Sequence, residues 1–239
     1  TTTSADLSWT AGATEAAWNI EYGATGFVQG AGATVAITAN SFEYVGLSAN
    51  MSYDFYVQAD CGANGTSAWA GPFTFTTLCD AVTVFPYSED FDTDWSCWSV
   101  NNADADSNTW SQSATYITPR SGDYTAHGMG NNDDYLISPK FSLTGNERVV
   151  WYDIVESANY SNTYDVLLST SGKEISDFTV NLGTYVCTNT SWTEYILDLS
   201  AYSGDVYIAL HQTSSASTNF GFGVDDFTVE EIPSIPPGC

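Results

Sequence analysis

The stretch Gly223-Val224-Asp225-Asp226-Phe227-Thr228-Val229 decides the fold, because it sets apolar residues beside a pair of carboxylates. Its apolar residues are spaced as in a strand with one face in a core, and Asp225 and Asp226 are expected where that face meets a loop. A similar stretch, Ser88-Glu89-Asp90-Phe91, opens the same long segment. Carboxylates gathered in this way are costly unless a cation shares them. The segment between these stretches is therefore predicted to be a β-sandwich that binds Ca²⁺ and serves recognition rather than catalysis.

The charge balance narrows the possible partners. The 239 residues include 29 Asp and Glu but only 4 Lys and Arg, for a formal net charge of −25. A field of that sign repels nucleic acid, anionic membranes and densely sulfated polymers. No apolar run approaches the roughly 18 residues of a membrane span. We therefore expect no nucleic-acid partner and no membrane insertion, and most of the acids are expected to form a solvated surface.

Aromatic residues make up 15% of the chain, with 15 Tyr and 8 Trp. Together with many Ser, Thr and Gly residues, this composition suits strands, turns and exposed rings that stack on sugars. For any single ring, the ordinary alternative is a place in the core of a secreted β-sandwich.

The first third of the chain alternates as short strands separated by Gly-rich turns. The alternation is clearest in residues 5–9, 18–22 and 53–59. Trp9, residues 46–53 and residues 71–77 resemble parts of a fibronectin type III domain. They match its buried tryptophan, the turn before its tyrosine corner and its last strand. The resemblance covers about 75 residues and implies that the first strand of this domain precedes Thr1.

The remainder of the chain carries many more strand-like runs and no stretch of helical length with a period of 3.6. Examples are residues 135–138, 148–152, 164–168, 192–199 and 206–210. Five or more strands joined by long polar loops suggest a jelly roll. The predicted fold class is therefore all-β, with two β-sandwiches in series.

A set of short motifs runs along this second segment. They are Glu89-Asp90-Phe91-Asp92, Cys97-Trp98, residues 104–110, Ser121-Gly122-Asp123-Tyr124, residues 134–139, residues 157–160, Trp192, residues 198–202 and Val224-Asp225-Asp226-Phe227. As a set they resemble the MAM-like cleaved-adhesin modules of secreted bacterial surface proteins, including gingipain haemagglutinin regions. One departure lies in the acidic loop, where the family usually carries Gly and this chain has Ala105 and Ser107. The predicted domains are residues 1–78 and 79–232, followed by a linker tail at 233–239.

Five cysteines are an odd number for a chain that looks secreted, so at least one has no internal partner. The fibronectin resemblance implies that Cys61 and Cys79 lie at opposite ends of the first domain, which disfavours a bond between them. We expect Cys79 to pair with Cys97 instead, and leave the pairing of Cys61, Cys187 and Cys239 open. With only two His and no C-x-x-C, the sequence matches no zinc pattern.

Calcium is the predicted cofactor, because Ca²⁺ takes oxygen ligands gathered from distant loops. The cleaved-adhesin resemblance places the first strand of the segment beside the last, so Glu89 is expected to meet Asp225 and Asp226. Asp104 and Asp106 are expected to share that ion or to form a second site. The alternative is that Asp104 and Asp106 form turns and that the other pair ends a solvated strand.

A ligand site is predicted where aromatic rings gather beside polar groups. The candidate residues are Trp110, Tyr116, Arg120, Tyr124, His127, Tyr160 and Phe220. In an acidic protein, an Arg beside aromatic rings is suited to orient hydroxyl or carboxylate groups. The alternative is that Tyr124 packs in the core and Arg120 pairs with a nearby acid.

No motif for catalysis is present: the chain has no G-x-S-x-G, no H-E-x-x-H and no phosphate-binding or dinucleotide fingerprint. The predicted function is non-catalytic, Ca²⁺-dependent polysaccharide binding by a monomeric module of a larger secreted or cell-surface bacterial protein. Neutral or lightly charged glycans suit the net charge better than sulfated ones, and other domains of the same chain are further possible partners. The alternatives are adhesion to host-matrix protein and a purely architectural spacer.

Overall fold

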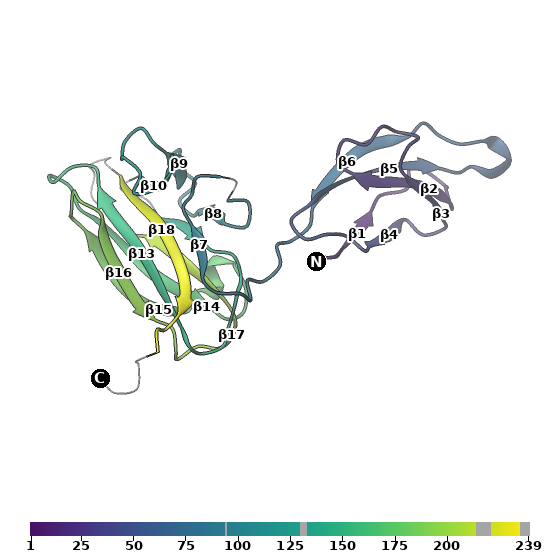
Figure 1. The fold of residues 1–239 in the computed structure, drawn as a ribbon. Helices are drawn as coiled ribbons and strands as arrows, with labels where there is room; N and C mark the ends of the chain where they lie inside the picture. The colour runs from purple at the N-terminus through teal and green to yellow at the C-terminus, as the bar shows by residue number, and fades with distance from the viewer. Residues whose placement is uncertain (94, 130–132, 214–220, 235–239) are drawn as a thin grey trace. The chain divides into compact units, whose positions relative to one another are not determined.

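The computed structural model describes residues 1–93, 95–129, 133–213 and 221–234. Its regular structure is almost entirely strand, and the chain divides into two compact units, Thr1–Asp80 and Ala81–Cys239 (Figure 1). The prediction of an all-β chain built from two sandwiches is confirmed. Two short 3₁₀ turns, η1 (Gly62–Asn64) and η2 (Ile175–Asp177), are the helical elements of the described residues.

The first unit packs a two-stranded sheet, β1-β4, against a four-stranded sheet, β3-β2-β5-β6. Its strands are β1 (Ser4–Ser8), β2 (Trp18–Ala24), β3 (Ala33–Ile37), β4 (Ser41–Val45), β5 (Ser52–Ala59) and β6 (Ala70–Thr76). Trp18, Ile20 and Val57 are buried at its centre. Trp9 is only half-buried and meets Trp18 edge-on, with 6.0 Å between the ring centroids.

The turn before β5 contains the contact expected of a tyrosine corner. The backbone N–H of Ser48 donates a hydrogen bond of 2.9 Å to the hydroxyl of Tyr53. This bond ties the turn to the start of a central strand, as the sequence motif requires. The assignment of this unit to the fibronectin type III class stays a prediction.

The second unit holds two six-stranded antiparallel sheets. One has the order β16-β13-β18-β10-β9 with β7 also paired to β18, and the other has the order β15-β14-β17-β11-β8 with β12 also paired to β17. Their strands are β7 (Tyr87–Glu89), β8 (Ser99–Asn102), β9 (Ser111–Ser113), β10 (Thr125–Gly128), β11 (Asp134–Ile137), β12 (Phe141–Leu143), β13 (Glu147–Val155), β14 (Asn162–Ser169), β15 (Val180–Cys187), β16 (Thr193–Asp198), β17 (Gly204–Gln212) and β18 (Phe222–Glu231).

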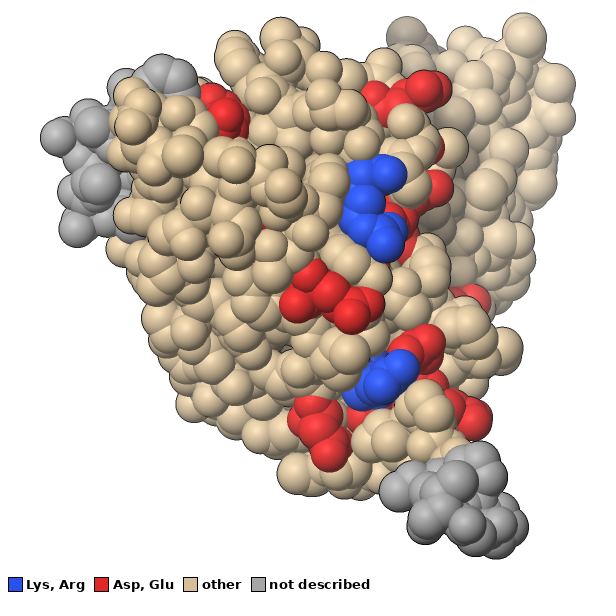
Figure 2. Space-filling view, turned by 60° about the vertical axis from the view of Figure 1, so that its left-hand side comes forward, with Lys and Arg blue, Asp and Glu red and all other residues tan. Residues whose placement is uncertain are grey.

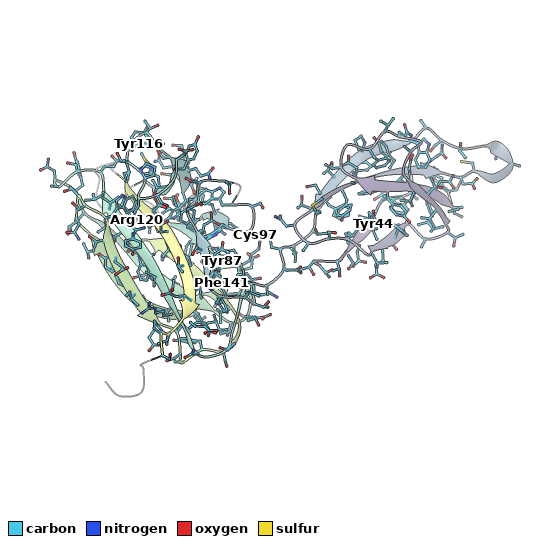
Figure 3. All side chains as sticks on the ribbon, in the orientation of Figure 1. Tyr44, Tyr87, Cys97, Tyr116, Arg120 and Phe141 are labelled. Atoms are coloured by element: carbon cyan, nitrogen blue, oxygen red, sulfur yellow. The ribbon has the colours of Figure 1, made fainter. Side chains whose placement is uncertain are left out.

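The core of this unit lies between the two sheets and is lined by large aromatic side chains. Trp151 on β13, Tyr164 on β14 and Phe227 on β18 are all fully buried. Each such side chain contributes about 1.5–3 kcal/mol by leaving water. Tyr87 meets Phe141 edge-on at 5.2 Å and extends this packing toward β12 (Figure 3).

The first strand of the unit lies beside the last, as the cleaved-adhesin resemblance implies. Strand β7 pairs antiparallel with β18, so that Glu89 stands opposite Phe227 and Ser88 opposite Thr228. Side chains of directly opposed residues point to the same face of a sheet. Glu89 therefore shares the inner face with the buried Phe227, whereas Ser88 and Thr228 face outward and bond through their hydroxyls at 2.9 Å.

The predicted disulfide between Cys79 and Cys97 is confirmed. Cys61 is an exposed free thiol and Cys187 is a buried one. Cys239 lies outside the described residues.

A chain of polar groups crosses the core between the two sheets. The indole N–H of Trp151 donates to the hydroxyl of Tyr164 at 2.9 Å, and that hydroxyl donates to Asp153 Oδ2 at 2.8 Å. Asp153 is fully buried, and its Oδ1 has no hydrogen-bond partner. Desolvation raises the pKa of this carboxyl, although hydrogen bonds from Tyr164, Cys187 and Tyr195 oppose the shift.

We predict that Asp153→Asn removes a pH-dependent contribution to stability. The folded-state pKa of Asp153 is raised, so the carboxyl stabilises the fold when protonated and loses that contribution as pH rises through its folded pKa. The Asn variant should equal or exceed the wild type in free energy of unfolding at neutral pH. That advantage should shrink toward about pH 4, the unfolded value. Urea titrations at several pH values measure this, and a difference that does not vary with pH would contradict it.

Candidate ligand-binding site

A hollow of about 520 Å³ opens at one end of the second unit. Three segments form it: the connection from β9 to β10, the end of β13, and the connection from β15 to β16. Its lining residues are Tyr116, Ile117, Thr118, Pro119, Arg120, Ile154, Val155, Glu156, Thr190, Ser191 and Trp192. The hollow thus combines two aromatic side chains with hydroxyl, carboxylate and guanidinium groups.

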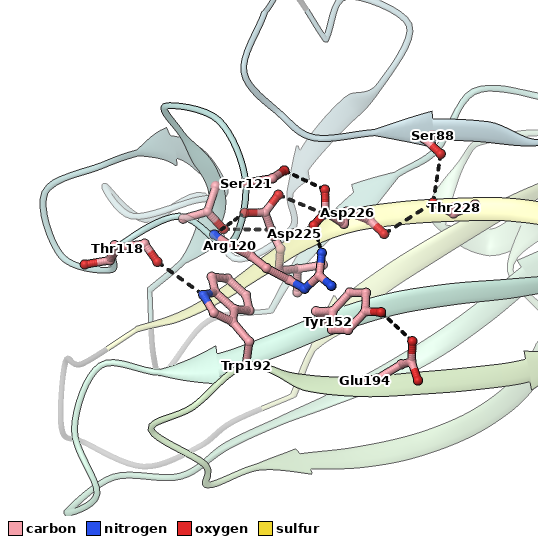
Figure 4. Close-up of polar contacts among 12 residues, drawn as sticks. Ser88, Thr118, Arg120, Ser121, Tyr152, Trp192, Glu194, Asp225, Asp226 and Thr228 are labelled. Atoms are coloured by element: carbon pink, nitrogen blue, oxygen red, sulfur yellow. Dashed lines mark hydrogen bonds and ion pairs between the residues drawn. The ribbon is translucent and has the colours of Figure 1, made fainter.

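Trp192 joins two of these segments. Its indole N–H donates a hydrogen bond of 3.3 Å to the carbonyl oxygen of Thr118 (Figure 4). The bond holds the indole ring against the connection from β9 to β10. A ring fixed in this way can meet a ligand without losing further rotational freedom.

Arg120 is held by three separate contacts (Figure 4). Its backbone N–H donates to Asp225 Oδ2 at 2.8 Å, and its guanidinium forms an ion pair with Asp226. The guanidinium carbon also lies 3.5 Å from the ring centroid of Tyr152, in cation–π geometry. The hydroxyl of Ser121 donates to Asp226 at 2.7 Å. These contacts attach the whole connection from β9 to β10 to the central strand β18.

The two acids of β18 differ in their surroundings. Asp225 is fully buried, and desolvation raises its pKa to about 6 although the amides of Arg120 and Asp226 donate to it. Asp226 has a left-handed backbone with φ of 47°. Non-glycine residues seldom adopt this conformation, and Asp is among those that tolerate it best. The break in the strand therefore turns one carboxylate inward and the other toward Arg120.

A second hollow, of about 450 Å³, lies on the other side of Arg120. It covers the outer face of β13, β16 and β18, with the exposed Ile196 and the ion pair of Arg148 with Glu230 along it. Figure 2 shows a face of the molecule on which each cationic patch borders acidic groups. Because Arg120 lines both hollows, the two are adjacent and together suit a ligand longer than a single sugar ring.

The connection from β9 to β10 is held at a second point by Asp92. Its Oδ1 accepts hydrogen bonds from the backbone N–H groups of Asp123 at 2.6 Å and Tyr124 at 2.8 Å. Gly122 lies against this carboxylate with a φ of 59°, and a Cβ there would stand 1.5 Å from Asp92 Oδ2. Glycine is therefore required at this position both by conformation and by space.

Three predicted ligand residues lie at or beside the first hollow. Tyr116 is 61% exposed, and its ring stacks on His127 with 5.2 Å between centroids. His127 is only 1% exposed, and its Nε2 lies 2.8 Å from a carboxylate oxygen of Glu156. His127 is therefore buried and packs against the ring of Tyr116, and its own role in ligand binding stays a prediction. Arg120 lines the hollow, but its guanidinium pairs with Asp226. Pairing with a nearby acid was the alternative to ligand binding that the sequence left open for Arg120.

The other predicted ligand residues lie elsewhere. Trp110 is 2% exposed, because it packs edge-on against Phe222 and donates its indole N–H to the carbonyl oxygen of Asp134. Trp110 is therefore a core residue in this structure, and its predicted role in ligand binding stays a prediction that its burial disfavours. Tyr124 is 42% exposed beside Asp92, so it does not pack in the core. Tyr160 is half-buried against the core, and Phe220 lies outside the described residues.

The five predicted metal ligands do not converge on one place. Glu89 lies on the inner face, where it accepts hydrogen bonds from the hydroxyl of Tyr87 and the amide of Phe91, both at 3.1 Å. Burial is the main reason that the pKa of Glu89 is raised. Asp226 faces outward toward Arg120.

Asp104 and Asp106 lie in the connection from β8 to β9, beside Asp134 of β11, the strand that pairs with β8. Desolvation raises the pKa of Asp134 to about 6, and the charges of Asp104 and Asp106 add to that shift. Across the described ranges, no group of three or more His, Cys, Asp or Glu side chains has the arrangement of a metal site. Any cation site here would therefore need neutral oxygen ligands as well.

Sequence reasoning missed Trp192, Tyr152 and Glu156 as site residues. Trp192 follows the polar run Thr188-Asn189-Thr190-Ser191 and directly precedes strand β16. That position was a usable signal. The sequence holds no such signal for Tyr152 and Glu156, because strand alternation does not show which outward-facing residues border a hollow.

Comparison with known proteins identifies the second unit. Residues 84–229 match the Cleaved Adhesin Domain family, which is more than half of the chain. The chain belongs to this family. No curated protein matches the chain. The cleaved-adhesin part of the sequence resemblance is thereby confirmed.

Solved cleaved adhesin domains share this fold. The K3 domain of Lys-gingipain from Porphyromonas gingivalis W83 is 21% identical with a TM-score of 0.54, and the match covers 61% of this chain and 98% of that one. The K1 domain of the same protein is also 21% identical at a TM-score of 0.54, and the match covers 63% of this chain and 100% of that one.

Within the described residues, no helix is long and apolar enough to cross a membrane.

We predict that Gly122→Ala destabilises this module more than Gly204→Ala does. Both glycines have positive φ, but a Cβ at Gly122 would collide with Asp92, whereas a Cβ at Gly204 meets nothing within 4 Å. Gly204→Ala should cost only the left-handed strain of about 1–2 kcal/mol, and Gly122→Ala should cost more. Chemical denaturation of both variants measures the difference. Equal losses would show that Asp92 yields freely and does not hold the connection.

Proposed function

We propose that the cleaved adhesin unit is a non-catalytic carbohydrate-binding module of a larger secreted or cell-surface bacterial protein. The observation that carries this proposal is the hollow where the exposed Tyr116 and the hydrogen-bonded Trp192 stand beside a fixed Arg120. Aromatic faces suit the apolar faces of pyranose rings, and hydroxyl and carboxylate groups suit their hydroxyls. Thr118, Ser191 and other polar residues of the lining supply the second requirement.

Rigidity supports this proposal. The segments that line the hollow are joined by Trp192 to Thr118 and by Arg120 to β18 before any ligand arrives. A surface ordered in advance loses little conformational entropy on binding. The small entropy loss favours ligands that make weak contacts, such as neutral sugars. A flexible surface would bind such ligands less tightly, because ordering it would cost more free energy.

The charge pattern favours neutral or lightly charged glycans. The positive charge of Arg120 is already balanced by Asp226, so it is poorly available to a ligand anion. The chain as a whole carries −25, and such a field weakens the approach of polyanions. Arg120 is better placed to donate hydrogen bonds to sugar hydroxyls.

Calcium dependence is the second part of the proposal. Buried carboxylates support it, because a divalent cation offsets the cost of keeping such groups charged. The acids of β18 fit this role only partly. Both oxygens of Asp225 already accept amide hydrogen bonds, and Asp226 already has Arg120. Glu89 and Asp225 remain candidates for one Ca²⁺, with Asp104 and Asp106 at a separate place.

We predict that polysaccharide retards the protein in affinity gels and that Trp192→Ala or Tyr116→Ala removes the effect. Each ring should account for at least about tenfold in affinity, or about 1.4 kcal/mol. Phe73→Ala is the matched control, because Phe73 is a half-exposed ring in the first unit. Retardation that survives both site substitutions would place the glycan elsewhere. Binding to matrix proteins alone would favour the protein-adhesion alternative.

We predict that excess Ca²⁺ raises the melting temperature of the protein relative to a chelator. A cation that binds only the folded state stabilises it by about 2.7 kcal/mol at a hundred times its dissociation constant. Thermal melts in Ca²⁺ and in EDTA at matched ionic strength measure the shift. Identical melting temperatures would rule out the calcium part of the proposal and leave carbohydrate binding to be judged by the gels.

A further inference from the structure

The two aromatic rings of the first hollow lie over neighbouring strands of one sheet. His127 on β10 is directly opposite Gly223 on β18, so both positions point to the same face. Tyr116 stacks on the imidazole of His127, with 5.2 Å between the ring centroids. Trp192 lies over Gly223, because a Cβ there would stand 3.3 Å from Cη2 of its indole. The two rings therefore cover positions about 4.8 Å apart, which is the spacing of neighbouring strands.

A carboxylate lies beside the two rings, at the end of the next strand. Ile154 on β13 is opposite Gly223, and Glu156 follows it by two residues, which places both on the same side of an extended chain. The backbone N–H of Glu156 donates to the carbonyl oxygen of Gly221 at 3.4 Å, which continues the pairing with the chain before β18. Glu156 lines the same hollow as the two rings.

The carboxylate of Glu156 is oriented by the protein itself. Its Oε1 lies 2.8 Å from Nε2 of His127 and accepts a hydrogen bond of 3.3 Å from the backbone N–H of Gly221. Within the described residues, both of these contacts end on Oε1, so Oε2 is the oxygen that can accept from a ligand. A neutral imidazole can donate one N–H, so the contact with His127 does not by itself cancel the negative charge of Glu156.

The positive charge of Arg120 is directed away from Glu156. Its guanidinium forms an ion pair with Asp226 and lies 3.5 Å from the ring centroid of Tyr152 (Figure 4). Both of these partners line the second hollow and not the first. The ion pairs that Lys and Arg form within the described ranges all involve acids other than Glu156. Glu156 is thus an acid of the first hollow whose charge no Lys or Arg pairs with there.

Aromatic faces beside an oriented carboxylate are suited to an organic ammonium group. The face of a ring attracts a cation electrostatically, and the indole of tryptophan does so most strongly. A carboxylate oxygen accepts strong, charge-assisted hydrogen bonds from the N–H groups of an ammonium. The formal net charge of −25 on the chain adds a long-range attraction for a cationic ligand.

We propose that the first hollow binds the ammonium group of an amino sugar within a glycan. Tyr116 and Trp192 are its aromatic walls, and Glu156 is the acceptor that determines the preference for a free amine over an acetylated one. This inference rests on the proposed function and deepens it, because it names the class of sugar. A glycan with free amines on some of its rings is lightly charged, and the sign of its charge is opposite to that of the protein.

A lysine side chain offers the same ammonium group without a pyranose ring. The lining of the hollow also includes the hydroxyl groups of Thr118, Thr190 and Ser191. These groups suit the several hydroxyls of a sugar, whereas the aliphatic part of a lysine side chain forms hydrogen bonds with none of them. The lining therefore favours a glycan over a lysine of a partner protein.

A matched pair of ligands tests the inference: a disaccharide of glucosamine, and the same disaccharide with both amines acetylated. Calorimetry on the full chain at about pH 6, where an ordinary amine carries its proton, measures both affinities at one ionic strength. The amino form should bind at least about tenfold more tightly. Glu156→Gln should remove this preference and retain the affinity for the acetylated form, because it keeps the side-chain shape and removes the charge.

Glu231→Gln is the matched control, because it removes the same charge from an exposed residue at the far end of β18. Loss of the preference in Glu156→Gln with retention in Glu231→Gln supports the inference. Equal losses in the two variants overturn it, because they would show an effect of net charge alone. A lysine-containing peptide that binds more tightly than the amino disaccharide overturns the choice of a glycan.

Failure of this inference differs in outcome from failure of the proposed function. If the unchanged protein binds both disaccharides equally and Trp192→Ala loses both, the amine preference is wrong and the carbohydrate site stands. If neither disaccharide binds and no polysaccharide retards the protein, both proposals are overturned. The comparison of the two ligands on the unchanged protein stays decisive even if a variant fails to fold.

Discussion

The second unit depends on one strand, β18, which is hydrogen-bonded to three other strands. It pairs with β13, β10 and β7, and Phe227 and Val229 fill the core on its inner face. Two adjacent acids interrupt its alternation, and Asp226 takes a left-handed conformation at that point. The interruption is what allows one strand to close the sandwich and to hold Arg120. A regular strand would place one of these carboxylates in the core without a donor and leave the connection from β9 to β10 unattached.

Much of the fold follows from patterns that the sequence displays openly. Apolar alternation located the strands, and the cleaved-adhesin resemblance implied that the strands around Glu89 and Asp225 are neighbours, as the pairing of β7 with β18 confirms. The Cys79–Cys97 bond was also predicted, because the fibronectin resemblance disfavoured a bond between Cys61 and Cys79. The positions of the strands depend on local periodicity, which a single sequence carries. The strand pairing and the disulfide depended on motifs that resemble those of known families.

The candidate site was less predictable, because its geometry depends on which rings reach the surface. Trp110 follows a polar acidic run, yet the next strand carries it into the core against Phe222. Trp192 follows a polar run of the same kind and reaches the hollow. The difference arises from the packing of the two sheets. The burial of Asp134 was not predicted for a related reason. Its neighbour Asp133 is exposed, and strand alternation alone does not show which of the two acids the β8–β9 connection covers.

The attachment of Arg120 to β18 has a kinetic consequence. A recognition surface that needs no rearrangement is met in its final shape at every encounter. Association is then limited mainly by diffusion and orientation, and related ligands differ chiefly in how long they stay. For a module on a long polymer, short residence on each segment would allow exchange between neighbouring segments without loss of the polymer. Under the proposed function, retention would then come from the number of binding modules acting together and not from the strength of any one.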